Sequence, residues 1–340
     1  MPSSISVIIP SYNAENTISR CIESILKTGY TPIEIIIVDD CSTDETSEII
    51  DHLVKKYPET LKKISHEKNS GPATARNTGA NIAKGELLFF LDSDTEMLPD
   101  CLDRFESGME TADAIIGIYD IEPLNKGAVP LYKSLINFYL FNYSGMIEYE
   151  VFDSSKAGIR RTIFEETGGF NENLTWKMDY ENEELGYRIH ENYKMILNPK
   201  IKVKHVFPGF KKLTWVYFHR VNLWMKIFLK RRKFESGGTT SSKIGIASAS
   251  LLLCLSFTLL GLGSELTSLN NYSVHLYSIS TVFILVYLYG YANFFVFIAK
   301  HKPSFLITGI LLNIYFTLVI ACGASFGLLS FIFSTQEENV

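Results

Sequence analysis

The sequence predicts an α/β protein in which a doubly wound, mostly parallel sheet is followed by an interfacial amphipathic helix and three transmembrane helices. Short β-branched apolar runs alternate with amphipathic stretches from residue 6 to residue 91, and residues 244–334 contain only three charged side chains. With 340 residues, of which 46% are hydrophobic and 20% charged, the chain is too apolar for a disordered protein and too long for one ordinary core.

The elements of the first part follow one another in a strand, loop, helix order. They are predicted by apolar runs of strand length and by apolar spacings of three and four residues. In chain order we expect a strand at 6–10, a helix at 16–27, a strand at 33–38, a helix capped near Ser42 or Thr43, a strand at 61–65, a helix at 72–83, a strand at 87–91 and, further on, a strand at 201–206. Alternating strands and helices form parallel sheets, whose ligands bind beyond the carboxyl ends of the strands.

Polar residues stand at three of these strand ends, as Tyr12-Asn13, Asp39-Asp40 and Asp92-Ser93-Asp94. Two carboxylates two residues apart suit Mg²⁺ or Mn²⁺, which prefer carboxylates together with substrate phosphates. The pair Asp39-Asp40 can accept hydrogen bonds from a pyrimidine imide or a ribose. For both acidic pairs the alternative is a turn or a helix cap.

Charge divides the chain. Residues 1–197 carry 18 basic and 33 acidic side chains, whereas residues 198–233 carry 11 basic ones and no acid. An acidic body argues against a nucleic-acid partner, and the basic segment beside the apolar region indicates membrane lipids. The five cysteines are widely spaced and form no CxxC pair, so we expect neither a disulfide framework nor a zinc site. We also expect no signal peptide.

The last third of the chain predicts a membrane domain, residues 244–334. Its three helices are expected at about 244–263, 274–299 and 305–333, each long enough for a hydrocarbon layer of about 30 Å. Residues 211–235 predict a basic amphipathic helix in the membrane interface, with packing on the protein itself as the alternative. Basic residues beside the helices place residues 1–210 in the cytosol and the C-terminus outside, in a multi-pass protein of the cell inner membrane.

Two glycines four residues apart, Gly323 and Gly327, stand in the last apolar segment. This spacing permits another helix to approach closely. We expect it to serve packing within the protein's own bundle, with dimerisation as the alternative.

Seven short motifs carry a resemblance to a known family. They are SVIIPSYN at 6–13, IVDDCSTD at 37–44, GPATARNTG at 71–79, FLDSD at 90–94, GGF at 168–170, ELGYR at 184–188 and VKH at 203–205. In these motifs and their order, about residues 4–235 resemble the membrane-tethered family 2 glycosyltransferases with the GT-A fold. The resemblance implies inverting transfer of a sugar from a nucleotide-sugar donor, expected to be UDP-linked, to a lipid-linked acceptor, with Mg²⁺ or Mn²⁺ as cofactor. Such chemistry belongs to cell-envelope polysaccharide or glycolipid synthesis.

The resemblance also assigns roles to single residues. Those implied to bind the donor are Pro10, Tyr12, Asn13, Asp39, Asp40, Arg76, Asp92 and Ser93. Those implied to hold the metal are Asp92, Asp94 and His205, and those implied on the acceptor side are Gly169, Phe170, Trp176 and Arg188. Structural roles remain open, since Arg76 can cap its helix, His205 can be a strand-end residue and Trp176 can anchor its loop.

One position departs from the family pattern. The aspartate that deprotonates the acceptor hydroxyl in this family corresponds to Asn182, and an amide has no basic lone pair near neutral pH. Three explanations stay open. A neighbouring carboxylate takes the proton, with Glu181 preferred over Asp179 and Glu183; or the acceptor is a polyprenyl phosphate that needs no base; or the protein is a non-catalytic scaffold that binds the nucleotide sugar.

Overall fold

The computed structural model describes residues 2–142, 145–174, 181–231, 242–267 and 270–337. The chain divides into two compact units. Unit 1 comprises residues 1–125 and 141–207, and unit 2 comprises residues 126–140 and 208–340. The boundary after residue 207 lies close to the one expected at residue 210, whereas the assignment of residues 126–140 to the second unit is a feature that the sequence pattern does not indicate.

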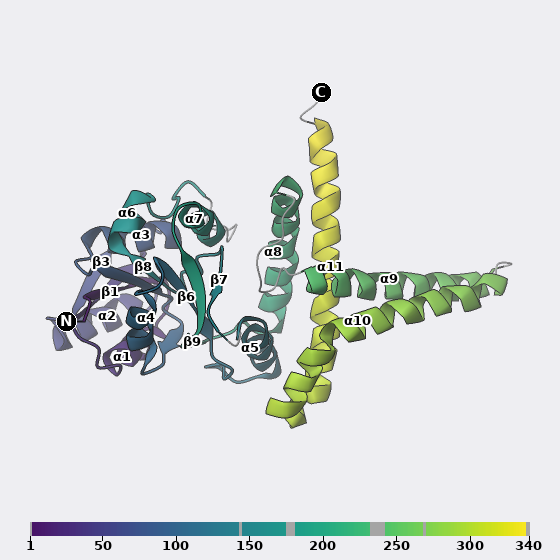
Figure 1. Cartoon of the computed structure of the whole chain (residues 1–340), viewed down its shortest axis with the longest axis horizontal. Coiled ribbons are helices and arrows are strands. Elements are labelled where there is room, and N and C mark those ends of the chain that lie inside the picture. Colours follow the sequence, from purple (N-terminus) through teal and green to yellow (C-terminus); the bar gives the residue numbers. More distant parts are fainter. Residues whose placement is uncertain (1, 143–144, 175–180, 232–241, 268–269, 338–340) are drawn as a thin grey trace. The chain divides into compact units, whose positions relative to one another are not determined.

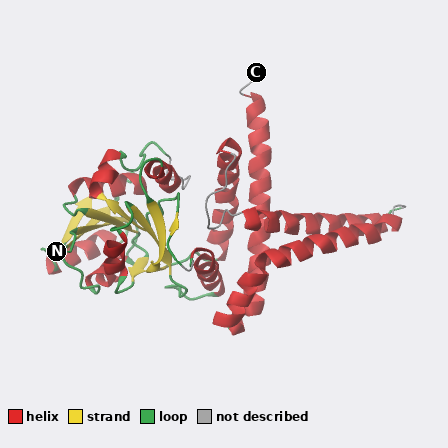
Figure 2. Cartoon of the chain, viewed as in Figure 1, coloured by secondary structure: helices red, strands yellow, loops and turns green. Residues whose placement is uncertain are grey.

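Unit 1 is built on a mixed sheet, nine-stranded within the described residues (Figure 2). The strands are β1 (Ile5–Ser11), β2 (Ile33–Asp39), β3 (Leu61–Ser65), β4 (Leu87–Leu91), β5 (Thr95–Met97), β6 (Ala114–Tyr119), β7 (Ile147–Glu148), β8 (Lys156–Arg160) and β9 (Met195–His205). Their order is β3-β2-β1-β4-β8-β6-β9-β5, with β7 beside β9. The first four strands of this order pair in parallel, which confirms the predicted half of the sheet.

The other half of the sheet mixes directions. Strand β8 runs antiparallel to both β4 and β6, and β5 and β7 run antiparallel to β9, while β6 and β9 are parallel. The turn to antiparallel pairing at β8 brings a later segment of the chain beside the carboxyl end of β4. This arrangement decides which side chains surround the Asp92-Ser93-Asp94 turn.

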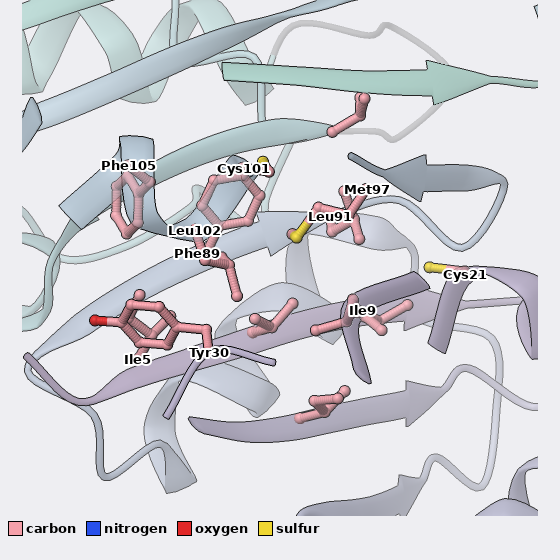
Figure 3. Packing of buried hydrophobic residues seen from close by; sticks show 14 of the residues in the cluster. Ile5, Ile9, Cys21, Tyr30, Phe89, Leu91, Met97, Cys101, Leu102 and Phe105 are labelled. Carbon is pink, nitrogen blue, oxygen red and sulfur yellow. The ribbon is translucent and has the colours of Figure 1, made fainter. Parts of the chain in front are cut away.

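Helices cover both faces of the sheet (Figure 1). They are α1 (Ile18–Leu26), α2 (Thr46–Lys56), α3 (Pro72–Ile82), α4 (Cys101–Gly108), α6 (Arg161–Glu166) and α7 (Glu181–His190). Alternate residues of the strands, such as Ile9 and Phe89, join Phe105 of α4 and the apolar side of α1 in one buried cluster (Figure 3). Because side chains alternate across a strand, the residues between them must be buried by other helices.

Aromatic rings and a close helix contact bury the opposite face. The ring of Phe90 lies 5.2–5.9 Å from those of Phe152, Phe164 and Phe170. A Cβ at Gly79 of α3 would stand 2.6 Å from Cγ2 of Ile8, so α3 packs directly on β1. This close approach also draws the earlier turns of α3 against the carboxyl edge of the sheet.

The second helix begins later than predicted. It starts at Thr46, whose N–H donates to Asp44 Oδ1 at 3.0 Å, so the cap does not lie at Ser42 or Thr43. Those two residues make hydrogen bonds in the preceding loop instead, to Asp39 and Asn13. Asn13 and Asp39, which follow or end strands, therefore bond the two residues that the sequence pattern assigns to the helix start.

Unit 2 is helical throughout the residues that the structure describes. It contains α5 (Ala128–Phe141, the last residue of which belongs to unit 1), α8 (Phe210–Arg231), α9 (Ser242–Glu265), α10 (Ser273–His301), α11 (Leu306–Glu337) and the 3₁₀ turns η3 (Asn270–Tyr272) and η4 (Pro303–Phe305). By length and composition, α9, α10 and the segment from η4 through α11 are each able to cross a membrane, as predicted.

A buried polar group joins three helices of unit 2. Asn313 of α11 accepts a hydrogen bond from the hydroxyl of Tyr287 at 2.5 Å and donates one to the hydroxyl of Tyr132 at 3.1 Å. The ring of Tyr132 stacks on Phe316, with centroids 5.4 Å apart. An unpaired amide in an apolar interior is costly, so these bonds favour one arrangement of α5, α10 and α11.

Gly323 and Gly327 of α11 contact the backbone of α8. A Cβ at Gly323 would stand 2.5 Å from the carbonyl oxygen of Phe218, and a Cβ at Gly327 the same distance from that of Asn222. Since the partner residues advance in step, α8 runs beside α11 in the same direction (Figure 1). The packing interpretation of this motif is confirmed, and Met225 of α8 also lies against α11, with its Cβ 2.9 Å from the position of a Cβ at Gly327.

We expect Gly327→Ala to destabilise unit 2, because its methyl group would meet the Asn222 carbonyl oxygen at 2.5 Å. Overpacking of this kind costs about 1–3 kcal/mol. The matched control is Gly263→Ala in α9, where a Cβ meets nothing within 4 Å. Alanine in place of an exposed helical glycine stabilises by about 0.5–1 kcal/mol. Thermal unfolding in detergent should shift down for the first variant and not for the second; equal shifts would contradict the packing.

Candidate active site

Three parallel strands bring the predicted residues to one edge of the sheet. Ser11 pairs with Asp39 in the register of β1 and β2, and β4 lies on the other side of β1. The loops that follow these strands therefore start side by side. Tyr12 is 48% exposed and Ser93 half-buried, so both have access to a ligand at this edge. Pro10 is half-buried within β1.

The first two strand ends stabilise each other. Asn13 has φ of 50°, and its Oδ1 accepts a hydrogen bond from the N–H of Thr43 at 2.8 Å. Asp39 is 3% exposed, and its Oδ1 accepts one from the N–H of Ser42 at 3.1 Å. These bonds fix the loop after β2 against the loop after β1, and they use one oxygen of each side chain.

Asp40 is turned toward the next loop. Its Oδ1 accepts a hydrogen bond from the N–H of Ser70 at 2.9 Å, and its Oδ2 accepts one from the N–H of Gly71 at 2.8 Å. The Nδ1 of His66 lies 2.7 Å from Oδ1. With both oxygens engaged at 3% exposure, Asp40 anchors the entry of α3, which differs from the expected contact with the donor. His66 is a partner that the sequence pattern does not indicate.

Arg76 links two acidic elements inside the site. Its Nη2 donates to Asp92 Oδ1 at 2.8 Å, and its Nη1 lies 3.6 Å from Oε1 of Glu181. The guanidinium lies over the ring of Phe170, 5.5 Å from its centroid. Arg76 is 5% exposed, and its Nε and Nη1 have no hydrogen-bond partner among the residues that the structure describes. A buried cation with unused donors between two carboxylates holds both of them at the edge of the sheet.

The second carboxylate of the turn faces the predicted histidine. Oδ1 of Asp94 lies 3.3 Å from Nε2 of His205, because Thr95 pairs with His205 between β5 and β9. The His205 ring lies 4.8 Å from the rings of both Tyr119 and Phe207, which hold its plane. Within the described part of the chain, no group of three or more His, Cys, Asp or Glu side chains is arranged so that it could hold a metal ion.

The donor set nevertheless suits a divalent cation that also binds a diphosphate. Asp94 is 41% and Asp92 31% exposed at the side chain, so both carboxylates are open to a ligand. Mg²⁺ and Mn²⁺ typically take few protein ligands and fill the rest of their coordination sphere with phosphate oxygens and water. The exposed carboxylates of Asp92 and Asp94 are therefore compatible with a metal that is shared with a diphosphate.

The residues around Asn182 differ in exposure. The Glu181 side chain is 8% exposed beside Arg76, and Glu183 is buried on the same helix. Asn182 accepts hydrogen bonds through its backbone oxygen from the N–H of Phe152 and through Oδ1 from the N–H of Ser154. Asp179 and Trp176 lie outside the described residues.

Phe170 and Arg188, which are expected on the acceptor side, both make structural contacts. Phe170 is 2% exposed, and both its N–H and its carbonyl bond the Asn77 side chain. Arg188, whose side chain is 31% exposed, donates to the carbonyl oxygens of Thr167 and Gly169 and pairs with Glu184. These bonds stabilise the Gly168-Gly169 turn, where both residues have positive φ. Phe170 is thus buried, whereas Arg188 is partly exposed and bonded to the turn.

Four further residues lie beside the Asp94-His205 pair without any sequence signal of their own. The hydroxyl of Tyr119 lies 2.7 Å from Oγ of Ser155, which donates to Asp153 Oδ1 at 2.6 Å. The buried Lys156 forms an ion pair with Asp153, and its Nζ lies 3.9 Å from the centroid of the Tyr119 ring. Burial raises the pKa of Tyr119 well above its ordinary value, and the charges of Asp153, Asp92 and Asp94 raise it further.

Comparison with known families identifies the domain to which this edge of the sheet belongs. The sequence pattern described as "Glycosyl transferase family 2" matches residues 6–168. The chain carries a family 2 glycosyltransferase domain. Strands β1 to β8 and the Asp92-Ser93-Asp94 turn all lie within the matched residues.

Several curated relatives of the family 2 domain come from bacteria. It is similar to "Uncharacterized glycosyltransferase YibD" of Escherichia coli (strain K12), with 40% identity over 95 residues, 28% of this chain and 27% of the relative. "Glycosyltransferase GlyG" of Streptococcus pneumoniae is 37% identical over 122 residues, 35% of this chain and 40% of the relative. "Putative teichuronic acid biosynthesis glycosyltransferase TuaG" of Bacillus subtilis is 42% identical over 100 residues, which are 29% of this chain and 39% of the relative. The chain thus spans only about a quarter to two fifths of the length of these relatives.

Solved structures confirm a fold of the GT-A type. The mannosyltransferase PcManGT of Pyrobaculum calidifontis, solved with GDP-Man and Mn²⁺, aligns over 98% of this chain and 88% of its own, with a TM-score of 0.57 and 16% identity. GalNAc-T7, solved with UDP, GalNAc and Mn²⁺, aligns over 68% of this chain and 51% of its own, with a TM-score of 0.52 and 20% identity. At these identities the likeness concerns the fold alone.

We expect Arg76→Met to destabilise unit 1 by about 3–5 kcal/mol, because it leaves two inward-facing carboxylates without their shared cation. Arg104→Met is the control, since Arg104 pairs with Asp100 at 2.6 Å on the surface, where such pairs contribute about 0–1 kcal/mol. The loss of stability in each variant is measured by urea titration of the full chain in detergent, with amide hydrogen exchange as the probe of unit 1. Similar losses for the two variants would contradict a central role for Arg76.

Proposed function

We propose that this protein is an inverting, metal-dependent glycosyltransferase that moves a sugar from a nucleotide-sugar donor to a lipid-linked acceptor at the cytosolic face of the membrane. The observation that carries the proposal is the contact of Asp94 with His205 at the carboxyl edge of the sheet, where Asp92 stands two residues before Asp94 and Tyr12 is exposed. Its position matches the general rule for ligand sites of open α/β sheets.

The residues of the site divide the work of the transfer. Tyr12 offers an exposed ring to the base of the donor, and the loop fixed by Asn13 and Asp39 borders the same space. A divalent cation held by Asp92, Asp94 and His205 would neutralise charge on the diphosphate. Arg76 holds Asp92 in place, because its Nη2 donates a hydrogen bond to Asp92 Oδ1 at 2.8 Å. The site therefore stabilises a leaving group that becomes more negative as its bond to the sugar breaks.

In an inverting transfer, the acceptor oxygen attacks the anomeric carbon from the side opposite the diphosphate. The new bond forms between acceptor oxygen and carbon while the bond from that carbon to the phosphate oxygen breaks. A hydroxyl acceptor must give up its proton to a base. General-base catalysis typically raises the rate by about 10²–10⁴-fold. A nucleoside diphosphate and a glycoside with inverted configuration are the products.

The donor and the pathway are proposed from the relatives. Solved structures of the same fold hold UDP-GlcNAc, as in TarS of S. aureus, or GDP-Man, as in PcManGT. A UDP-linked sugar is our first choice, and a GDP-linked one is the alternative. TuaG and the "Succinoglycan biosynthesis protein ExoO" of Rhizobium meliloti are named for polysaccharide synthesis, which supports a role in building cell-envelope polysaccharide or glycolipid.

Asn182 supports two further candidates. A polyprenyl-phosphate acceptor arrives as an anion and needs no base, so an amide at this position would cost nothing. A scaffold that binds the nucleotide sugar without turnover would also tolerate it. A donor screen with the full chain in detergent separates the three, by reading released nucleoside diphosphate with UDP- and GDP-sugars, Mn²⁺, and either a glycolipid or a polyprenyl phosphate. Release with the glycolipid supports our first proposal, release with the phosphate the second, and binding without release the third.

We expect Asp94→Ala to abolish transfer and Mn²⁺-dependent donor binding, because one carboxylate fewer leaves the diphosphate charge poorly neutralised. Asp103→Ala, on the exposed side of α4, is the control and should keep both. Isothermal titration with the nucleotide sugar, with and without Mn²⁺, measures binding apart from turnover. Full activity of the unaltered protein in EDTA would show that no divalent cation is needed.

The proposed orientation has its own test, in a variant whose five native cysteines are replaced. A cysteine placed after Gln336 should react with an impermeant thiol reagent added to intact cells. A cysteine in place of His301, the last residue of α10, should react only after the cells are opened. The opposite labelling pattern would place the family 2 domain outside the cytosol.

A further inference from the structure

The carboxylates that the sequence offers as a substitute base are poorly placed for that role. Glu181 lies 3.6 Å from the buried guanidinium of Arg76, with its side chain 8% exposed, and Glu183 is 2% exposed. A base must come within hydrogen-bond reach of a hydroxyl that enters from solvent. Neither side chain presents an open oxygen to such a hydroxyl.

Asp153 approaches the same position from a different element. It stands in the loop between β7 and β8, and its side chain is 36% exposed. Both of its neighbours are tied to Asn182: the N–H of Phe152 donates to the Asn182 carbonyl oxygen at 3.2 Å, and the N–H of Ser154 donates to Oδ1 at 3.3 Å. These two bonds hold Asp153 beside the residue that occupies the family's base position.

Asp153 also belongs to the group of residues around the proposed metal ligands. Ser155 Oγ connects its carboxylate to the Tyr119 hydroxyl through contacts of 2.6 and 2.7 Å, and the Tyr119 ring lies 4.8 Å from His205. Through Ser155 and Tyr119, Asp153 is thus linked to His205, one of the residues proposed to hold the metal.

Lys156 fixes the position of the Asp153 carboxylate. It is 4% exposed and forms an ion pair with Asp153 Oδ2, while its Nζ lies against the Tyr119 ring. The ion pair fixes the direction of the carboxylate, so Lys156 is a positioning residue.

We propose that Asp153 is the general base of the transfer and that the acceptor group is a hydroxyl. As the acceptor oxygen bonds to the anomeric carbon, its O–H becomes acidic and the proton passes to the Asp153 carboxylate. The bonding pair from carbon to phosphate oxygen leaves with the nucleoside diphosphate. This inference rests on the glycosyltransferase function proposed above and excludes a phosphate acceptor for this chain.

The test is turnover and donor affinity of Asp153→Asn in the full-length protein, with the hydroxyl acceptor found in the donor screen. The variant should lose about 10²–10⁴-fold in kcat, the usual contribution of a general base, with the Kd for the nucleotide sugar within about threefold of wild type. Asp103→Asn on the surface of α4 is the matched control and should keep full turnover.

A second substitution separates a base from a merely structural aspartate. Asn182→Asp restores a carboxylate at the family's base position, which is tied to the same loop by the bond from Ser154. In the Asp153→Asn background it should recover at least tenfold of the lost kcat, whereas lost packing would not be recovered. Asp153→Asn turnover within a few-fold of wild type, or a loss confined to Glu181→Gln, would overturn the inference.

Turnover by the unaltered protein distinguishes failure of the Asp153 inference from failure of the proposed glycosyltransferase function. A wild-type chain that transfers to a hydroxyl while Asp153→Asn does the same rejects Asp153 alone. A wild-type chain that transfers only to a polyprenyl phosphate rejects the hydroxyl acceptor, and with it Asp153. A wild-type chain that binds the nucleotide sugar and releases no diphosphate with any acceptor rejects the glycosyltransferase function itself.

Discussion

The buried guanidinium of Arg76 is the interaction on which the arrangement of the site depends. It joins the turn after β4 to the start of α7, two segments far apart in the sequence, by contacting Asp92 at 2.8 Å and Glu181 at 3.6 Å. Removing charges from water is expensive, so this group is stable only with its carboxylates close by. The contact of Gly79 with Ile8 places the helix that makes this possible.

The same constraint explains why the base is sought elsewhere. Glu181 balances the charge of Arg76 and is covered by protein, so it serves the structure of the site. The Asp153 side chain in the loop before β8 is 36% exposed, and the two neighbours of Asp153 are bonded to Asn182. One element thus holds the donor side in place while another offers an accessible carboxylate.

Unit 2 rests on a different principle, because apolar helices gain little from apolar contact in a lipid environment. Small residues and buried polar groups then determine which helices meet. Gly323 and Gly327 admit the backbone of α8, and Asn313 binds hydroxyls of α5 and α10. The basic segment that reads as an interfacial helix is therefore also a packing partner of α11.

The sequence by itself determined the parallel half of the sheet, the three long apolar helices and the Asp92-Ser93-Asp94 turn, since these follow from local periodicity and from residues adjacent in the chain. It did not indicate the antiparallel strand β8, the place of α5 in unit 2, or the roles of Asp40 and Arg188 in stabilising loops. Those depend on contacts between distant segments, and a carboxylate or guanidinium looks the same in the sequence whether it meets a ligand or a backbone group. Only the tertiary structure decided that Asp153 stands beside Asn182, because the two bonds that bring them together join residues 28 and 30 positions apart in the chain.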